Sequence, residues 1–368
     1  MIALESARLL VGAATWLLTW TLHATIASAV ALGAGRWLVQ SPRQRDVLWK
    51  TALLLPLASA TLTSAGVTPA RLLRDIDIPA LVRPAWPGGN QYRVERRTRR
   101  SDAEVVTRTF ATDTVAVDVS AAALAGGIAL AFAGLSSVVR RHRVFRRRLG
   151  RRVPVTELPD EDALADASFP MRVTMSPALE GPVALGWSEI CVPSGFFEAL
   201  TDSQQRGVLR HEAAHLERHD PFWFAAADIL VALAPWQPLI RPLVRAMRRD
   251  AEFACDDAVV DAMGDGRALV QSFAVFARPF DPRESVLAAR CNGSPLEERA
   301  RRILAPSGQR GGGPLGLAVV AALVLLCSLA FAAPAVTTRT VDVRPPTGTV
   351  PRIIRVTDSV ITIKQLKD

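Results

Sequence analysis

The stretch 210–220, RHEAAHLERHD, places two of the chain's five histidines four positions apart, with a glutamate directly after the first. On a helix, positions i and i+4 lie one above the other, so His211 and His215 could bind one metal ion between them. Glu212 would then lean toward the open side of the metal, where a general base for hydrolysis is needed. The alternative is an ordinary solvated helix face of His, Glu and Arg.

This interpretation requires a helix around the two histidines. Thr201 followed by Gln204 predicts a capping box at its start, and a run of good helix formers follows. Pro221 is expected to end the helix, because proline cannot continue one.

A catalytic zinc site takes three protein ligands and one water, so a third ligand is needed. Of the other histidines, His23 lies in an apolar segment and His142 in an arginine run. His219 is one turn further along the predicted helix, too far to join the same metal. A third histidine at the metzincin spacing would fall on Pro221, which excludes that class.

A carboxylate is the remaining option for the third ligand. The stretch 250–257, DAEFACDD, places Glu252 and Asp256 on one face of a second predicted helix. Glu252 could complete a His/His/Glu site, and Asp256 could hydrogen-bond the distal nitrogen of a ligand histidine and so fix its tautomer. The alternative is a helix that carries exposed acids.

The elements that must hold these residues include several apolar runs, in a chain whose hydrophobic fraction is 49%. Four runs are long enough, or nearly so, to cross a bilayer: residues 9–34, 51–67, 119–139 and 315–335. The first run lacks a basic flank before it and is too long for a cleaved signal peptide, so a retained anchor is expected. Pro56 interrupts the second run.

The net charge of +9 does not indicate a nucleic-acid-binding protein, because the basic residues flank the apolar runs. Residues 140–153 follow the third run, and four basic residues lie between the first two: Arg36, Arg43, Arg45 and Lys50. The positive-inside rule places both segments in the cytoplasm and both termini outside a multi-pass cell-membrane protein. The basic stretch 93–100 conflicts with this scheme, since it falls in a loop expected to be external.

The resulting domain prediction has four parts: a three-span region 1–139 with an external loop 68–114, a cytosolic domain 140–313 that holds the metal, a fourth span 314–335 and a short external tail 336–368. A joint is expected at 308–313, and the tail is too short for an independent sensor domain. All four cysteines are expected to be reduced: Cys191, Cys255, Cys291 and Cys327.

Residues 222–240 are apolar enough for a fifth span, but a crossing would put His211 and Glu252 on opposite sides of the membrane. Asp228 and the prolines 235 and 238 instead indicate a broken helical hairpin, buried or lying at the membrane surface. Residues 188–193, SEICVP, predict either an edge strand that pairs with an extended peptide or a plain core strand.

Three stretches together resemble the BlaR/MecR family of membrane zinc metallopeptidases: GPVALGWSEICVP, VLRHEAAHLERHD and APWQPLIRPLVRAMRRDAEFACDDAVV. The resemblance covers about residues 170–305, although Pro238 comes one place earlier than the second proline of the family's Pro-Trp-x-x-Pro element. It implies a mainly α-helical integral membrane protein with four transmembrane helices and a cytosolic α+β, gluzincin-like peptidase domain between spans three and four. It also implies one Zn²⁺ held by His211, His215 and Glu252, with Glu212 as the catalytic base.

The implied activity is that of a zinc metalloendopeptidase in signal transduction, which cleaves a BlaI/MecI-type transcriptional repressor or itself. The expected partners are therefore the lipid bilayer and a protein substrate, with no direct binding of nucleic acid. His219 or Arg218 could stabilise the oxyanion, because the single tyrosine, Tyr92, lies in the predicted external loop. The resemblance does not extend to β-lactam sensing, since the expected tail has no room for a penicillin-binding domain.

Two other functions are compatible with parts of the sequence. One is a non-catalytic membrane signalling or scaffold protein with a structural zinc, and the presence of Glu212 argues against it. The other is an HtpX-like quality-control protease, which shares the metal motif but not the stretches around it.

Overall fold

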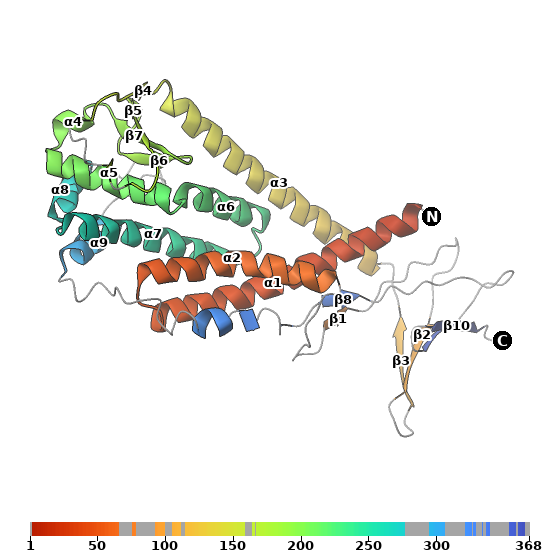
Figure 1. Cartoon of the computed structure of the whole chain (residues 1–368). Helices are drawn as coiled ribbons and strands as arrows, with labels where there is room; N and C mark the ends of the chain where they lie inside the picture. The colour runs from red at the N-terminus through yellow and green to blue at the C-terminus, as the bar shows by residue number, and fades with distance from the viewer. Residues whose placement is uncertain are drawn as a thin grey trace. The chain divides into compact units, whose positions relative to one another are not determined.

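The computed structural model describes residues 2–65, 76–78, 93–99, 105–111, 115–158, 164–165, 167–276, 294–305, 321–325, 327–328, 333, 336–338, 353–357 and 360–364. The chain divides into two compact units. The first comprises residues 1–22, 59–130 and 331–368, and the second comprises residues 23–58 and 131–330. The second unit holds all the predicted metal ligands together with parts of the two N-terminal helices (Figure 1).

Strands of the first unit come from two distant parts of the chain. β1 (Ile76–Ile78) pairs in parallel with β8 (Val336–Thr338). A second sheet has the order β10-β9-β2-β3, formed by β2 (Arg93–Arg99), β3 (Val105–Ala111), β9 (Ile353–Thr357) and β10 (Val360–Lys364). The segments predicted to be the external loop and the external tail therefore share one sheet, which requires that both lie on the same side of any membrane.

Two helices among the described residues are long and apolar enough to cross a membrane. They are α1 (Ile2–Trp37), whose candidate span is Gly12–Trp37, and α2 (Pro42–Ser64). α2 begins nine residues before the predicted run 51–67, because Pro42 starts it at a position where proline is favoured. Arg43, Arg45 and Lys50, which were expected between the spans, therefore lie inside α2.

The third predicted span lies within one described helix, whereas the fourth is described only in part. α3 (Val115–Leu149) is one continuous helix that includes the apolar run 119–139 and the arginine run after it. Within the run 315–335, residues 321–325 and 327–328 are helical, and most of the others lie outside the described residues. The expected joint 308–313 and Cys291 also lie outside them.

A four-stranded sheet opens the second unit after α3. Its order is β4-β5-β7-β6, with β4 (Val153–Pro154), β5 (Arg172–Ser176), β6 (Val183–Leu185) and β7 (Glu189–Pro193). β7 pairs in parallel with β5 and antiparallel with β6, and all five of its residues are buried. The edge-strand interpretation of residues 188–193 is therefore wrong, and the core-strand alternative is correct. The edge is β6.

The helices described after the sheet, up to residue 305, are α4 (Phe196–Ala199), α5 (Asp202–Glu217), α6 (Asp220–Leu233), α7 (Ile240–Met263), α8 (Arg267–Phe276) and α9 (Ser294–Leu304). The predicted capping box is present at the start of α5, where the Thr201 backbone N–H donates to Gln204 Oε1 at 3.0 Å. A core of apolar side chains joins α5 to the sheet, and it includes Ile190, Phe196, Leu209 and Val259. Burying each such side chain contributes roughly 1.5–3 kcal/mol, which fixes α5 firmly on the sheet.

The end of α5 differs from the prediction. The helix stops at Glu217, and Pro221 belongs to the first turn of α6 rather than ending α5. Between the two helices, His219 adopts a left-handed conformation with φ of 56°, which reverses the direction of the chain. His219 is therefore not on the same helix as His211 and His215.

The broken hairpin predicted for residues 222–240 is present as α6, a turn at 234–239 and the beginning of α7. α6 has 14 residues and is about 21 Å long, which is too short for the roughly 30 Å core of a bilayer. Both ligand helices therefore belong to the same compact unit. Among the described cysteines, Cys191 and Cys255 are buried and Cys327 is half-buried, and none of the three forms a disulfide.

Candidate metal centre

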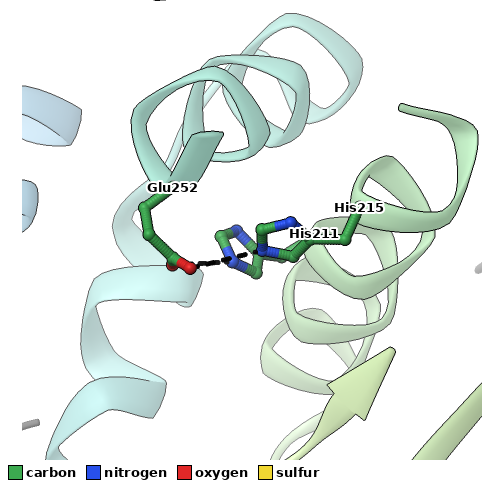
Figure 2. Close-up of side chains that lie close together, drawn as sticks. All are labelled: His211, His215 and Glu252. Carbon is green, nitrogen blue, oxygen red and sulfur yellow. Dashed lines mark ion pairs between the residues drawn. The ribbon is translucent and has the colours of Figure 1, made fainter. Parts of the chain in front are cut away.

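His211 and His215 point from α5 toward Glu252 on α7 (Figure 2). His211 Nε2 lies 3.5 Å from Glu252 Oε2, and His215 Nε2 lies 3.5 Å from Glu252 Oε1. One ligand atom from each of the three residues lies within 4.8 Å of the others. Both histidines are buried, and the glutamate side chain is 36% exposed, so the three residues form the wall of a partly open site.

This donor set fits a zinc ion. Zinc–ligand bonds of about 2.0–2.1 Å in a tetrahedral arrangement place neighbouring ligand atoms about 3.4 Å apart. The two observed separations of 3.5 Å are close to that value. Two imidazoles and one carboxylate also match the composition of catalytic zinc sites, which keep the fourth position open.

The other nitrogen of each histidine faces a buried carboxylate. His211 Nδ1 lies 3.2 Å from Asp256 Oδ1, and His215 Nδ1 lies 2.9 Å from Asp220 Oδ2. The side chains of both aspartates are 1% exposed. Contacts of this kind hold the rings so that both Nε2 atoms face the same point.

The sequence indicated Asp256 but not Asp220. If α5 had continued to Pro221, Asp220 would have been five residues beyond His215 and on a different face of the helix. The left-handed turn at His219 brings the aspartate back to the histidine. The available signal was the pair His219–Asp220. Histidine is enriched in left-handed turns, and an acidic residue follows it directly.

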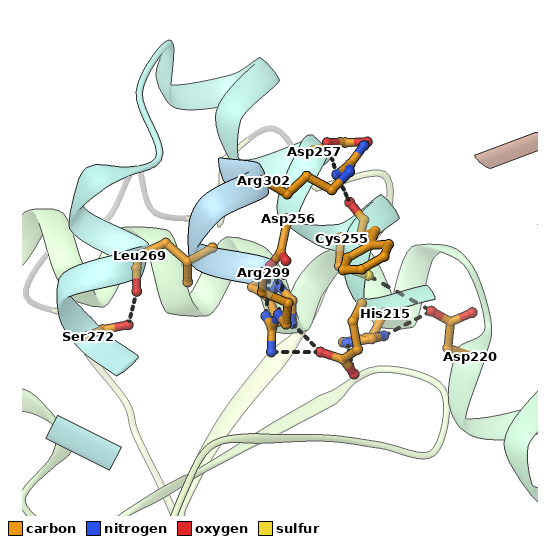
Figure 3. Close-up of polar contacts among 12 residues, drawn as sticks. His215, Asp220, Cys255, Asp256, Asp257, Leu269, Ser272, Arg299 and Arg302 are labelled. Atoms are coloured by element: carbon orange, nitrogen blue, oxygen red, sulfur yellow. Dashed lines mark hydrogen bonds and ion pairs between the residues drawn. The ribbon is translucent and has the colours of Figure 1, made fainter. Parts of the chain in front are cut away.

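Asp220 is held by several groups besides His215. Cys255 Sγ lies 3.9 Å from its Oδ2 (Figure 3). Arg218 Nε donates to the same Oδ2 at 3.1 Å, and Lys50 Nζ of α2 lies 3.7 Å from Oδ1. Burial tends to raise the pKa of Asp220, but His215 and Arg218 outweigh it and lower the pKa below its usual value. Asp220 is therefore a carboxylate at neutral pH.

Arg299 of α9 is the second contributor to the site that the sequence does not indicate. Its Nε and Nη2 donate to Asp256 at 2.9 and 2.7 Å (Figure 3). Its Nη1 lies 3.0 Å from Glu252 Oε2, and its Nη2 lies 3.3 Å from His211 Nε2. The stretch EERARRIL that contains it has the composition of a solvated helix, so nothing in the sequence singled it out.

Arg299 changes the proton affinity of the acids around it. Burial tends to raise the pKa of Glu252 and of Asp256, but the nearby guanidinium and His211 outweigh it and lower both values. For His211, burial tends to lower the pKa, but the contacts with Asp256 and Glu252 raise it to about 9. The cluster thus consists of ionised acids around an imidazole that binds a proton tightly.

A cavity of about 590 Å³ opens onto this cluster. His211, Glu212, His215 and Glu252 line it together with Arg299, and residues 183–184 of the edge strand β6 form another part of its wall. Glu212 is half-buried and lines the cavity together with both histidines.

The two residues predicted to stabilise the oxyanion are not among the described residues that line the cavity. Arg218 instead pairs with Asp46 and Asp220, each at 3.1 Å. The exposed His219 ring lies edge-on to Trp187, with 5.6 Å between the ring centroids. Both side chains are drawn away because α5 ends before them. Arg299 is the cation that lines the cavity among the described residues.

Comparison with known proteins gives one family. The model of the family described as BlaR1 peptidase M56 matches residues 48–269, more than half of the 368 residues. The matched range contains the two histidines, Glu212 and Glu252, and both buried aspartates, and it ends before Arg299. No curated protein matches the chain.

Proposed function

The chain belongs to the BlaR1 peptidase M56 family, and we propose that it is a membrane-anchored zinc metalloendopeptidase. The observation that carries this proposal is the convergence of three metal-binding side chains beside a cavity that Glu212 also lines. A structural zinc site has four protein ligands and no use for an adjacent base, whereas a hydrolytic site needs both an open position and a base.

The residues have distinct roles in the proposed reaction. Zinc held by His211, His215 and Glu252 would supply a water of lowered pKa and polarise the substrate carbonyl. Glu212 would take the proton of that water and pass it to the leaving amine. Arg299 is the best placed of the described cations to stabilise charge on the carbonyl oxygen, in place of Arg218 and His219.

The edge strand β6 supplies a place for the substrate backbone. Val183 and Ala184 line the cavity, and β6 pairs with β7 on one side only. A substrate segment in an extended conformation would add to the free side of β6 through main-chain hydrogen bonds. This selects a flexible protein segment rather than a folded helix as the substrate.

For the biological role, we propose signal transduction in which the peptidase cleaves a cytosolic protein, either a transcriptional repressor of the BlaI/MecI type or its own chain. This proposal extends the family resemblance to the substrate. The purified protein in detergent is expected to hold about one zinc and to cleave such a repressor until a chelator removes the metal. A metal-loaded protein that leaves both the repressor and itself intact would favour the scaffold alternative.

We also propose four membrane spans, with the peptidase part in the cytoplasm and both termini outside. The pairing of β2 with β9 supports one element of this topology, because the loop and the tail must be on one side. A membrane-impermeant thiol reagent added outside cells is expected to label cysteine at position 97 or 355 but not at position 198. Labelling at position 198 alone would invert the topology and exclude a cytosolic substrate.

A further inference from the structure

We propose that the turn at 234–239 and the adjoining ends of α6 and α7 enter the lipid bilayer as a re-entrant hairpin. The leaflet is the one that contains the C-terminal half of α1, and the lipid chains contact Ile229, Leu233 and Trp236. This inference rests on the proposed membrane placement of the chain, and it is independent of the peptidase chemistry.

The first observation is the depth at which the turn contacts α1. Gln237 Nε2 in the turn donates to Thr25 Oγ1 at 3.3 Å. Thr25 lies near the middle of the candidate span Gly12–Trp37, twelve residues before its end. Those residues correspond to about 18 Å along the helix, and half of a hydrocarbon core is about 15 Å. The turn therefore contacts α1 near the middle of the span and not at its end.

The middle of α7, at Asp250, contacts the beginning of α2, which follows shortly after the end of α1. Trp49 Nε1 donates to Asp250 Oδ2 at 2.8 Å, and Arg45 pairs with Asp250 Oδ1 at 3.1 Å. The distance from Ile240 to Asp250 along α7 is about 15 Å. This length agrees with the depth obtained from α1. The two contacts therefore place the turn beside α1 and the middle of α7 beside the start of α2.

A third contact gives the depth of α6 independently. A Cβ atom on Gly134 of α3 would lie 2.5 Å from the backbone oxygen of Ala232, so the two helices touch at that point. Gly134 belongs to the apolar run of α3 and precedes the arginine run by six residues, or about 9 Å. The end of α6 therefore contacts α3 within its apolar part.

The side chains of the hairpin suit a lipid environment. Ile229, Leu233 and Trp236 are each about 40% exposed within the described part of the chain. The polar Gln237 is buried instead, and its Oε1 accepts from the backbone N–H groups of Leu239 and Ile240 at 2.6 and 2.8 Å. The turn thus satisfies the first amides of α7 internally, as a bilayer requires because it supplies no water.

The charged residues limit how deep the hairpin goes. Arg241 and Arg245 are exposed on the first two turns of α7. Asp228 and Arg248 pair at 2.9 Å between the two helices, further from the turn. Long arginine side chains can extend to lipid phosphates while their stems stay in the apolar layer, so these positions indicate insertion into one leaflet only.

The proposed insertion has a consequence for the substrate. Glu252 follows Asp250 by two residues, and Asp250 is level with the start of α2. The metal centre would therefore lie near the membrane surface, and a cleavable bond would have to come within reach of the lipid headgroups.

Photocrosslinking of the unaltered full-length chain tests the proposal. The protein is placed in nanodiscs of phosphatidylethanolamine and phosphatidylglycerol that contain a lipid with a diazirine near the end of its acyl chain. Trypsin then releases the fragment 219–245, since Pro242 protects Arg241 from cleavage. Lipid adducts are expected on this fragment at a yield similar to that on the α2 fragment beginning at residue 51, where Leu54 is exposed.

The fragment beginning at residue 268 is the matched control, because Val275 of α8 is 46% exposed and is not expected in lipid. Adducts on α2 but not on 219–245 would overturn the hairpin insertion and leave the peptidase proposal intact. Absence of adducts on both would refute the membrane placement itself.

A pair of variants gives a second measurement. Leu233→Asp is expected to lower the apparent Tm of the protein in nanodiscs, since a carboxylate in the acyl region is unfavourable. Val275→Asp replaces a similarly exposed apolar side chain and is expected to leave the Tm nearly unchanged. Equal effects of the two substitutions would contradict the insertion.

Discussion

His215 Nδ1 lies 2.9 Å from Asp220 Oδ2, across the turn that separates α5 from α6. This contact leaves His215 Nε2 directed at Glu252, just as the position of Asp256 leaves His211 Nε2 directed at the same residue. The turn at His219 is therefore part of the metal site, because it carries the carboxylate that orients the second histidine.

The substitution Asp220→Asn tests this role. The amide keeps the size of the side chain but removes the charge that fixes the tautomer of His215, so zinc affinity is expected to fall by about 10–100-fold. Chelator competition on the purified protein measures it. Asp228→Asn on the same helix is the control, since that exposed residue pairs with Arg248 away from the site. Equal zinc affinities for the two variants would rule out an orienting role for Asp220.

Glu252→Ala tests the third ligand. The change removes one of three protein ligands, so zinc occupancy after dialysis is expected to fall severely, while Asp257→Ala is expected to keep it. Asp257 is on the same helix but pairs with Arg302 outside the cavity, at 2.6 Å. Full zinc retention in Glu252→Ala would mean that the third ligand is elsewhere.

Zinc binding is expected to depend on pH through His211. Its pKa of about 9 in the metal-free protein results from Asp256 and Glu252 on α7, opposed by burial and by Arg299 on α9. Zinc needs the neutral imidazole, so each binding event below pH 9 displaces a proton and the affinity should rise about tenfold per pH unit. Calorimetry in buffers of different ionisation enthalpy counts that proton. A zinc affinity that stays constant from pH 7 to 9, after correction for binding of zinc by the buffer, would contradict the prediction.

The same raised pKa affects the stability of the metal-free fold. A group whose pKa is raised on folding stabilises the fold at pH below its unfolded value of 6.5, and this stabilisation is lost as the pH rises through about 9. Bound zinc replaces the proton on His211, so the loss of stability between pH 6.5 and about 9 is expected in the metal-free protein and not in the zinc-loaded protein, as thermal unfolding at several pH values would measure.

Proline substitutions in β6 test whether substrate pairs with the edge strand. Neighbouring residues of this strand direct their N–H groups alternately toward β7 and toward the free side. Proline at whichever of positions 183 and 184 faces the free side is expected to raise KM several-fold without loss of zinc or of folding. Proline at the other position breaks the pairing with β7 and should destabilise the protein. An unchanged KM in the stable variant would exclude pairing at this edge.

The sequence predicted the parts of this site that depend on helical periodicity. His211 and His215, like Glu252 and Asp256, are spaced by four, so a single helix each is enough to align them. Asp220 and Arg299 reach the centre through a left-handed turn and through a helix more than forty residues after Glu252, and neither arrangement leaves a periodic pattern.

Some features of the fold were likewise predictable from the sequence and others were not. The helical hairpin at 222–240 followed from its prolines and its acid, and the capping box of α5 was correct. The sequence could not decide whether β7 is an edge strand or a central strand, because a short apolar run has the same pattern in both positions. The start of α2 was also missed, since its first turns carry charges, such as Arg45, that pair with acids of α7.

The most direct test of the central claim is Glu212→Gln. The amide keeps the size and hydrogen-bonding capacity of the side chain but cannot accept the proton, and Glu212 is not a metal ligand in this account. Zinc content is expected to stay at the wild-type level while cleavage of the repressor or of the chain itself falls by roughly 10²–10⁴-fold. Glu217→Gln on the same helix is the control, because Glu217 accepts from Ser168 and lies outside the cavity lining. Cleavage at the wild-type rate by a zinc-loaded Glu212→Gln protein would contradict the account.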